Sequence, residues 1–213
     1  MTCTSFDPIF VLDSRETLRP SPVEESIGIV NAGLVLSDPL KLDWPTPIKQ
    51  PVLPNVAYYR VHLGQTLNWH QWWLWWLDNP GPDIQLGVGR HEGDWEFVQI
   101  AATKDHQPIL VSASQHKWGG KREYWACERD GRRPVFYVGL GSHAMFFQPG
   151  SSGVDECNGR GLRIEQSEFR MFGDWAHYEG RWGNSASSPQ SPGKQGDRWH
   201  RPHLYHSGHC QAQ

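Results

Sequence analysis

Short apolar runs, separated by turns rich in glycine and proline, set the pattern of this chain. Val56–Leu63 mixes apolar and polar residues as a partly buried strand does, and Pro108–His116 follows a similar pattern. Leu67–Leu77 (LNWHQWWLWWL) alternates poorly and ends at a strong turn signal, Asp78–Pro82. A helix over Leu67–Leu77 would be apolar nearly all round, whereas tryptophan is enriched in strands. We therefore expect a strand or strand pair there, buried on both faces.

The second half of the chain continues the same pattern. Segment 91–100 (HEGDWEFVQI), Arg122–Cys127 and Pro134–Leu140 predict three more strands, with a hairpin-type turn at Asp130-Gly131. Strands do not alternate with helical patterns, which argues against a parallel α/β fold. The fold class that we predict is all-β, an antiparallel β-sandwich with long loops rich in Gly, Pro and Trp.

The length of 213 residues suits a single domain. Residues 1–50 are punctuated by proline and predict an irregular segment that packs on the sandwich. Residues 185–197 (SASSPQSPGKQGD) predict a flexible loop. The net charge of −3 and the lack of a basic run give no electrostatic basis for binding nucleic acid.

Location and redox state follow from two further patterns. No apolar stretch approaches the roughly 20 residues of a membrane span, and the N-terminus lacks the basic and apolar regions of a signal peptide. We therefore expect a cytoplasmic protein. The four cysteines are scattered without a CxxC pair, which argues against a zinc motif. Reduced thiols fit this pattern, and one bridge such as Cys127–Cys157 is the alternative.

The densest group of candidate ligands lies in segment 91–96 (HEGDWE). In an extended chain Asp94 and Glu96 point to one face. Gly93 permits a tight turn that can swing His91 round to the same face. Oxygen ligands with one imidazole favour Mg²⁺, Ca²⁺ or Mn²⁺ over Zn²⁺, so the segment predicts a divalent-cation site. The alternative is a polar cluster of ordinary charges that holds no metal.

A family resemblance rests on this segment and two later ones. HEGDWE, the SQH of Ser114–His116 and the PVFYVGLGSHA of Pro134–Ala144 together resemble the vacuolar-protein-sorting sixty-two family of fungi, plants and bacteria. Later residues, from Gly180-Arg181-Trp182-Gly183 to Arg198-Trp199, are also similar to its bacterial and fungal members. The name of that family records a sorting phenotype and implies no reaction.

Segment 91–96 also bears a more distant resemblance to the necrosis- and ethylene-inducing peptide-like cytolysins, whose hallmark is GHRHDWE. In that family the first His, the Asp and the Glu help to hold a divalent cation. The same spacing occurs here at His91, Asp94 and Glu96. A further Asp of the family comes from the preceding loop, in a Lys-Asp-x-Pro context. Asp78-Asn79-Pro80 resembles that context, and Asp83 lies nearer in sequence to segment 91–96. The resemblance therefore implies Asp78 or Asp83 as the extra ligand.

The chain also departs from that family, because Gly93 replaces the second His of the hallmark. No secretion signal is visible either. What this resemblance implies is therefore the β-sandwich and the metal site, and not the toxin activity.

Two histidines are candidate proton carriers. His116 and His143 each follow a predicted strand, at positions where the loops of a sandwich gather functional residues. Imidazole titrates near neutral pH, so both are candidates for general acid or base catalysis. The alternative is that each ring caps a turn through a hydrogen bond to the backbone.

The tryptophans have two interpretations. They can fill the core, since each buries a large area and needs one partner for its N–H. They can instead form an aromatic wall around an apolar ligand. The candidates for such a wall are Trp69, Trp72, Trp75 and Trp95.

Two functions remain open from these residues. The first is a small-molecule enzyme of lyase, cyclase or hydrolase type, with a divalent cation as Lewis acid and an aromatic-lined pocket. The alternative is a non-catalytic module that uses the cation to bind a sugar or a lipid headgroup.

Four histidines near the C-terminus are spaced by three residues, namely His200, His203, His206 and His209. A helix would align them, but Pro202 and Gly208 oppose a long helix, so we expect no designed metal site there.

Overall fold

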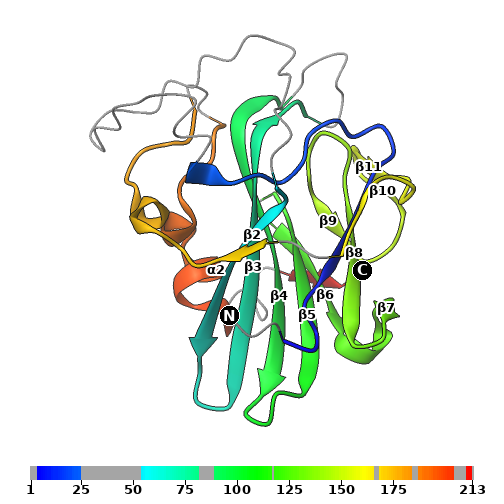
Figure 1. The fold of residues 1–213 in the computed structure, drawn as a ribbon, viewed down its shortest axis with the longest axis vertical. Helices are drawn as coiled ribbons and strands as arrows, with labels where there is room; N and C mark the ends of the chain where they lie inside the picture. The colour runs from blue at the N-terminus through cyan, green and yellow to red at the C-terminus, as the bar shows by residue number, and fades with distance from the viewer. Residues whose placement is uncertain are drawn as a thin grey trace.

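The structure, a computed structural model, describes residues 4–24, 54–81, 89–116, 118–165, 168–183, 187–203 and 210–212. Its larger sheet has seven strands in the order β13-β2-β3-β4-β5-β6-β14. Their bounds are β2 Val56–Leu63, β3 Leu67–Asn79, β4 His91–Thr103, β5 Pro108–Gln115, β6 Trp118–Glu123, β13 Glu168–Arg170 and β14 Cys210–Ala212. The long hairpins of β2–β3 and β4–β5 turn at the lower end of the molecule in Figure 1.

A second sheet of five strands has the order β12-β1-β8-β7, with β9 paired to β8. Its strands are β1 Ile9–Leu12, β7 Arg129–Asp130, β8 Arg133–Val138, β9 Met145–Phe146 and β12 Arg163–Ile164. A small hairpin joins β10 Gly150–Ser152 to β11 Asp155–Cys157. The helices that lie wholly within the described residues are single turns: η1 Tyr124–Ala126, η2 Asp174–His177, η3 Pro192–Lys194 and α2 Asp197–His200. Over the described residues, no helix has the length and apolar character needed to cross a membrane.

The predicted all-β sandwich is confirmed, with one refinement to its strand directions. Strands β2 to β6 form a continuous antiparallel ladder. Three pairs are parallel instead, namely β1 with β8, β13 with β2 and β14 with β6. In each parallel pair one partner is a short strand from near an end of the chain or from the loop-rich C-terminal third, which explains why local turn signals did not predict it.

Two apolar cores bury the two faces of the large sheet. Between the sheets, Trp72 and Trp76 of β3 pack with Phe10 of β1 and Phe136 of β8. The opposite face carries Trp73, Trp75 and Trp95, covered by Trp175, Trp182 and Trp199 from the C-terminal third. The run Leu67–Leu77 therefore forms one strand whose alternate tryptophans enter different cores, as its apolar character on both faces predicted.

Several boundaries differ from the sequence-based expectations. Arg122–Cys127 was expected to be a strand, but β6 ends at Glu123 and a 3₁₀ turn follows. Within the described part of the N-terminal segment, Ile9–Leu12 is a buried strand rather than irregular chain. Residues 184–186 lie outside the described residues, and η3 begins at Pro192 within the loop expected to be flexible. Cys127 and Cys157 are free thiols, and burial raises the pKa of each to about 11.

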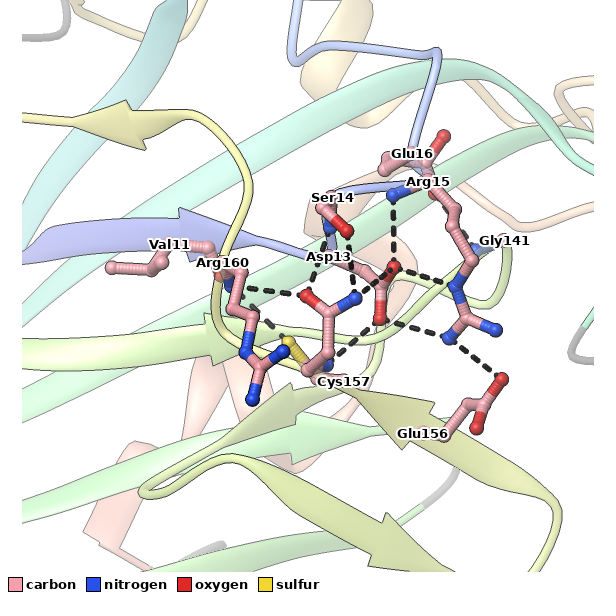
Figure 2. Close-up of polar contacts among 10 residues, drawn as sticks. Val11, Asp13, Ser14, Arg15, Glu16, Gly141, Glu156, Cys157 and Arg160 are labelled. Atoms are coloured by element: carbon pink, nitrogen blue, oxygen red, sulfur yellow. Dashed lines mark hydrogen bonds and ion pairs between the residues drawn. The ribbon is translucent and has the colours of Figure 1, made fainter.

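A polar clamp fixes the chain after β1 (Figure 2). The buried carboxylate of Asp13 accepts hydrogen bonds from the backbone N–H and the guanidinium of Arg15, and from the backbone and side-chain amides of Asn158. Arg15 also pairs with Glu156 at 2.7 Å. The clamp holds residues 13–16 against the segment that follows β11, and this fixes the position of Glu16 beside Gly141.

Candidate functional site

The candidate ligands lie where β3 ends and β4 begins. This end of the sheet is opposite the turns that join β2 to β3 and β4 to β5 (Figure 1). Gly93 makes this geometry possible because its φ is +66°, a conformation that other residues rarely adopt. A Cβ at Gly93 would lie 2.4 Å from Cη2 of Trp75 and 2.6 Å from the carbonyl oxygen of Trp182. Only glycine therefore fits between the strand and the segment that covers it.

The strand register places His91 on the side that Asp94 faces. His91 is paired with Asn79, and the side-chain amide of Asn79 donates to Oδ2 of Asp94 at 2.9 Å. Directly paired residues of an antiparallel ladder project to the same face, so His91, Asn79 and Asp94 share one side. Nδ1 of His91 lies 2.8 Å from the carbonyl oxygen of Gly93. The turn at Gly93 thus has the effect that its sequence predicts.

Asp94 points between the two sheets and meets His143. Nδ1 of His143 lies 3.0 Å from Oδ2 of Asp94, and Nε2 lies 3.7 Å from Oε2 of Glu16. The ring is fully buried and stacks on Trp76 with a centroid distance of 4.4 Å. Burial alone lowers the pKa of His143, but the bond to Asp94 and the charge of Glu16 outweigh it and raise that pKa. His143 therefore lies buried between two carboxylates, and both favour its protonated form.

This placement bears on the predicted role of His143. A proton carrier must reach the substrate within hydrogen-bond distance, directly or through one water. A ring without exposed surface, hydrogen-bonded to Asp94 through Nδ1 and facing Glu16 with Nε2, offers no such contact. The burial of His143 therefore argues against the proton-carrier role, which remains a prediction.

Glu96 lies where the ladder between β4 and β5 ends. The last registered pair is Val98 with Ala113, and beyond it the hydroxyl of Ser114 accepts from the N–H of Phe97 at 2.8 Å. The same hydroxyl donates to Oε2 of Glu96, and the N–H of His116 donates to Oε1 at 3.3 Å. Burial, and secondarily the charge of Asp94, raise the pKa of Glu96.

His116 is an exposed histidine of the site, with a side chain 46% exposed, and His91 is half-buried. Its φ is +54°, and Nε2 lies 3.0 Å from Oδ2 of Asp155 on β11. The hydrogen bond to Asp155 outweighs the opposing effect of burial and raises the pKa of His116 to about 9. The ring is therefore an imidazolium at neutral pH, suited to donating a proton or holding an anion rather than accepting a proton.

Asp78 keeps an unused carboxylate oxygen. Oδ2 accepts from Nη2 of Arg90 at 3.2 Å, while the buried Oδ1 has no hydrogen-bond partner within the described residues. Burial raises the pKa of Asp78 despite the opposing charge of Arg90. In the described part of the chain, no three His, Cys, Asp or Glu side chains come together as a set of metal ligands. Asp83, the other implied ligand, lies outside the described residues. The metal site therefore stays a prediction.

The four tryptophans predicted to form an aromatic wall are buried. Trp72, Trp75 and Trp95 are at most 3% exposed, and Trp69 is 8% exposed. Trp75 and Trp95 pack against each other at 4.9 Å between ring centroids, and Trp95 stacks on Trp175 at 5.2 Å. Large rings that are covered on all sides contribute burial energy, so these positions correspond to the core-filling interpretation and not to an exposed wall.

Sequence reasoning missed three residues that shape the site. Glu16 approaches His143 from the N-terminal segment, Asn79 binds Asp94, and Asp155 binds His116. Asp155 is 39 residues from its histidine, and Glu16 is 125 residues from Gly141, whose N–H it accepts. No local sequence motif predicts contacts between residues so far apart in the chain. Asn79 alone had a signal, because it directly follows the candidate Asp78.

Comparisons with known proteins give a fold and no family. No family model and no curated protein matches the chain. Among solved structures it is similar to the non-toxic HaNLP3 protein, with 15% identity, 82% of this chain and 73% of that chain covered, and a TM-score of 0.50. It is also similar to Necrosis and Ethylene inducing Protein 2 from the causal agent of cocoa's Witches Broom disease (16% identity; 71% and 69% covered; TM-score 0.43). A third is NLPPya in complex with mannosamine (15%; 78% and 70%; 0.45).

The similarity to the HaNLP3 protein supports the distant resemblance to the necrosis- and ethylene-inducing proteins at the level of fold. No comparison supports the resemblance to the vacuolar-protein-sorting sixty-two family. The fold is thus similar to that of the HaNLP3 protein, whereas function must be argued from the side chains of this chain.

Proposed function

We propose that the protein is a ligand-binding β-sandwich in which a divalent cation would draw together the carboxylates of Asp78, Asp94 and Glu96 and bind an oxygen-rich small molecule. These three residues are called the acidic site below. The observation that carries the proposal is the burial of all three carboxylates at one end of the hairpin of β3 and β4, with exposures of 6%, 5% and 3%. Buried carboxylates are costly unless a cation, a proton or a hydrogen-bond donor compensates them.

Two oxygens support the fit of a cation. Oδ1 of Asp78 is buried without a hydrogen-bond partner among the described residues. Asp94 engages the side chains of Asn79 and His143 through Oδ2, which leaves Oδ1 for another contact. Carboxylate oxygens with an imidazole such as that of His91 suit Mg²⁺, Ca²⁺ or Mn²⁺. A cation there would bind hydroxyl or carboxylate oxygens of a ligand, in the manner of a lectin.

Binding is favoured over catalysis by the two histidines. His143 has no exposed surface, and the raised pKa of His116 makes it a cation at neutral pH. Neither is a free base near the acidic site, whereas a binding protein needs none. The chain's own residues therefore supply orientation and charge, and the cation would supply the direct contact to ligand oxygens.

The test compares Asp94→Asn with an exposed control, Asp105→Asn, which lies in the turn between β4 and β5. Mg²⁺, Ca²⁺ and Mn²⁺ are titrated separately while the melting temperature and the heat of binding are measured. We expect at least one ion to raise the melting temperature of the wild type and of Asp105→Asn, and not of Asp94→Asn. An equal response of all three proteins to every ion would remove the cation from the proposal. Glu96→Gln provides a second variant if Asp94→Asn does not fold.

The ligand is sought on a panel of glycans and polar metabolites, with and without a chelator. Binding that requires the cation and is lost in Asp94→Asn supports the proposal. Binding that survives both changes would place the ligand site elsewhere.

The second candidate is a cation-assisted enzyme of lyase, cyclase or hydrolase type. The half-exposed pair of His116 and Asp155 favours it, since a protonated imidazole oriented by a carboxylate is a competent general acid. The cation-loaded protein is incubated with any ligand found above, and consumption is followed by mass spectrometry. Consumption by the wild type and not by His116→Gln supports an enzyme, whereas stoichiometric binding without consumption supports the binding protein.

A further inference from the structure

One aromatic and two basic side chains lie in a row on the face of β2 opposite the core between the sheets. Tyr58, Arg60 and His62 alternate along the strand, so all three project to one face. Tyr58 is buried there against Trp175, with ring centroids 4.7 Å apart. The guanidinium of Arg60 stacks over Trp199, with Cζ 3.8 Å from the ring centroid. The row therefore continues from the aromatic core out to the surface.

Arg60 has an unused set of donors. The guanidinium packs on the face of the Trp199 ring. Within the described residues it has no hydrogen-bond or ion-pair partner. A half-buried guanidinium normally meets a carboxylate or carbonyl oxygen, because its five N–H donors are costly to leave unpaired. Burial lowers the pKa of Arg60 to about 10, as expected where no acidic side chain compensates it.

His62 follows Arg60 by two residues on β2, and two positive charges act on it. The pKa of His62 is lowered by burial and then by the positive charges of Arg60 and His203. His203 follows α2, and the backbone of residues 197–203 is fixed over the sheet because the carbonyl oxygens of Arg198 and Pro202 accept hydrogen bonds from two buried glutamines of β3 and β4. One of these glutamines, Gln71, is the direct partner of Arg60 in the ladder. Arg60 and His62 therefore share one face of β2, and His203 belongs to a segment that is hydrogen-bonded to the same sheet.

We propose that Arg60, His62 and His203 form a binding site for a tetrahedral dianion, a sulfate or a phosphate group, with Trp199 holding the guanidinium in place. A guanidinium offers two parallel N–H donors that match two oxygens of such a group. When protonated, His62 and His203 each add a charged N–H donor. A dianion matches this combination better than a carboxylate does, because two or three positive charges converge on it. This basic site is independent of the acidic site and of the cation proposed there.

Protonation is linked to binding at this site. The charged groups that act on His62 are Arg60 on its own strand and His203 on the segment that follows α2, and both disfavour the imidazolium. A bound dianion reverses this effect and raises the pKa of His62, by roughly one unit or more for an opposite charge within 4–6 Å. By linkage the anion binds more tightly below the pKa of free His62 than above it, by about tenfold for each unit of that rise.

The test measures sulfate binding by calorimetry at constant ionic strength, with chloride as the balancing ion. Sulfate keeps its charge across the range in which histidine titrates, so any dependence on pH reports the protein. We expect Arg60→Met to weaken sulfate binding by roughly tenfold or more, since a charge-assisted pair of bonds is lost. The matched control is Arg129→Met, which removes a guanidinium that lies over Tyr124 at 5.1 Å. An equal loss in both variants would show a general effect of surface charge and overturn the site.

Two further measurements keep the proposal falsifiable if Arg60→Met is unstable. Arg60→Lys retains the charge and loses the paired donors, and is expected to fold and to bind sulfate more weakly. The NMR titration of His62 is expected to shift to higher pH when sulfate is added, and an unmoved titration would overturn the proposal. Methyl phosphate is the second probe. Tighter binding of methyl phosphate than of sulfate assigns the site to a phosphomonoester, and equal binding assigns it to free oxyanions.

Discussion

The buried histidine of β3 should make the stability of the protein depend on pH. His70 is 4% exposed and packs edge-on against Phe6, with ring centroids 5.2 Å apart. Nδ1 lies 2.7 Å from the hydroxyl of Tyr59, and the buried Nε2 has no hydrogen-bond partner within the described residues. Burial, together with a smaller effect of His106, lowers the pKa of His70 from 6.5 to about 4. The folded protein therefore holds this ring neutral.

The sign of the effect follows from where each state binds the proton. In the unfolded chain His70 takes up a proton as the pH falls through 6.5, whereas the folded chain takes it up only near pH 4. The unfolded state thus binds more protons between these values, and the free energy of unfolding falls as the pH falls through that window. Each unit of pKa difference corresponds to about 1.4 kcal/mol, so this residue alone should cost about 2 kcal/mol at pH 5 and about 3 kcal/mol below pH 4.

The assay is urea unfolding of the wild type and of His70→Asn from about pH 7.5 to about pH 5. The asparagine keeps a polar atom near the position of Nδ1 and does not titrate, so we expect its free energy of unfolding to lose about 2 kcal/mol less than that of the wild type over this range. His177→Gln is the control, since His177 is exposed on η2, and it should follow the wild type. If wild type and His70→Asn lose the same stability, the ring is not held neutral and the reasoning fails.

Two substitution pairs test the packing. Gly93→Ala forces a Cβ to within 2.6 Å of the carbonyl oxygen of Trp182 at a φ of +66°, and should destabilise by about 3 kcal/mol or more in urea unfolding. Gly131→Ala shares a positive φ but meets nothing within 4 Å, so a cost of about 1 kcal/mol is expected, and equal costs would contradict the close packing. Trp72→Ala, in the core between the sheets, should cost about 3–5 kcal/mol by thermal unfolding. Trp125→Ala, 72% exposed, should cost less than about 0.5 kcal/mol, and a comparable loss would refute the assigned burial.

The strands that form the large sheet were predictable because each carries its own pattern. Val56–Leu63 was expected as a strand with the bounds that β2 has, and the turn signal after Leu77 marks the end of β3 within two residues. Apolar residues on both faces of Leu67–Leu77 also predicted burial on both sides. What the pattern could not supply was the number of covering layers, since the aromatic cover of the second face comes from residues 172–199 with no regular period.

The candidate site was predictable only as far as its local segment. The alternation of Asp94 and Glu96 follows from strand geometry, and the turn at Gly93 follows from glycine. The partners of these carboxylates come from neighbouring strands of the same sheet, as Asn79 and Ser114 do, and from loops, as His143 and His116 do. His143 was identified as a titratable group near the site, but its burial depends on Trp76 and Glu16, which no motif connects with it. The residue type therefore identified a titratable group near the site, whereas its burial, which decides whether it can reach a ligand, depends on contacts distant in sequence.

Backbone strain gathers around the acidic site. His116 and His143 are two of the three residues other than glycine that have a positive φ in the described part of the chain. Such conformations cost of order 1 kcal/mol or more and persist where surrounding contacts enforce them, as they do at many functional sites. Here the contacts are the bonds of His116 to Asp155 and of His143 to Asp94. A core without a ligand to bind would gain stability from relaxed backbone and apolar side chains at these positions, so strain and buried charge together favour a binding site over an inert polar cluster.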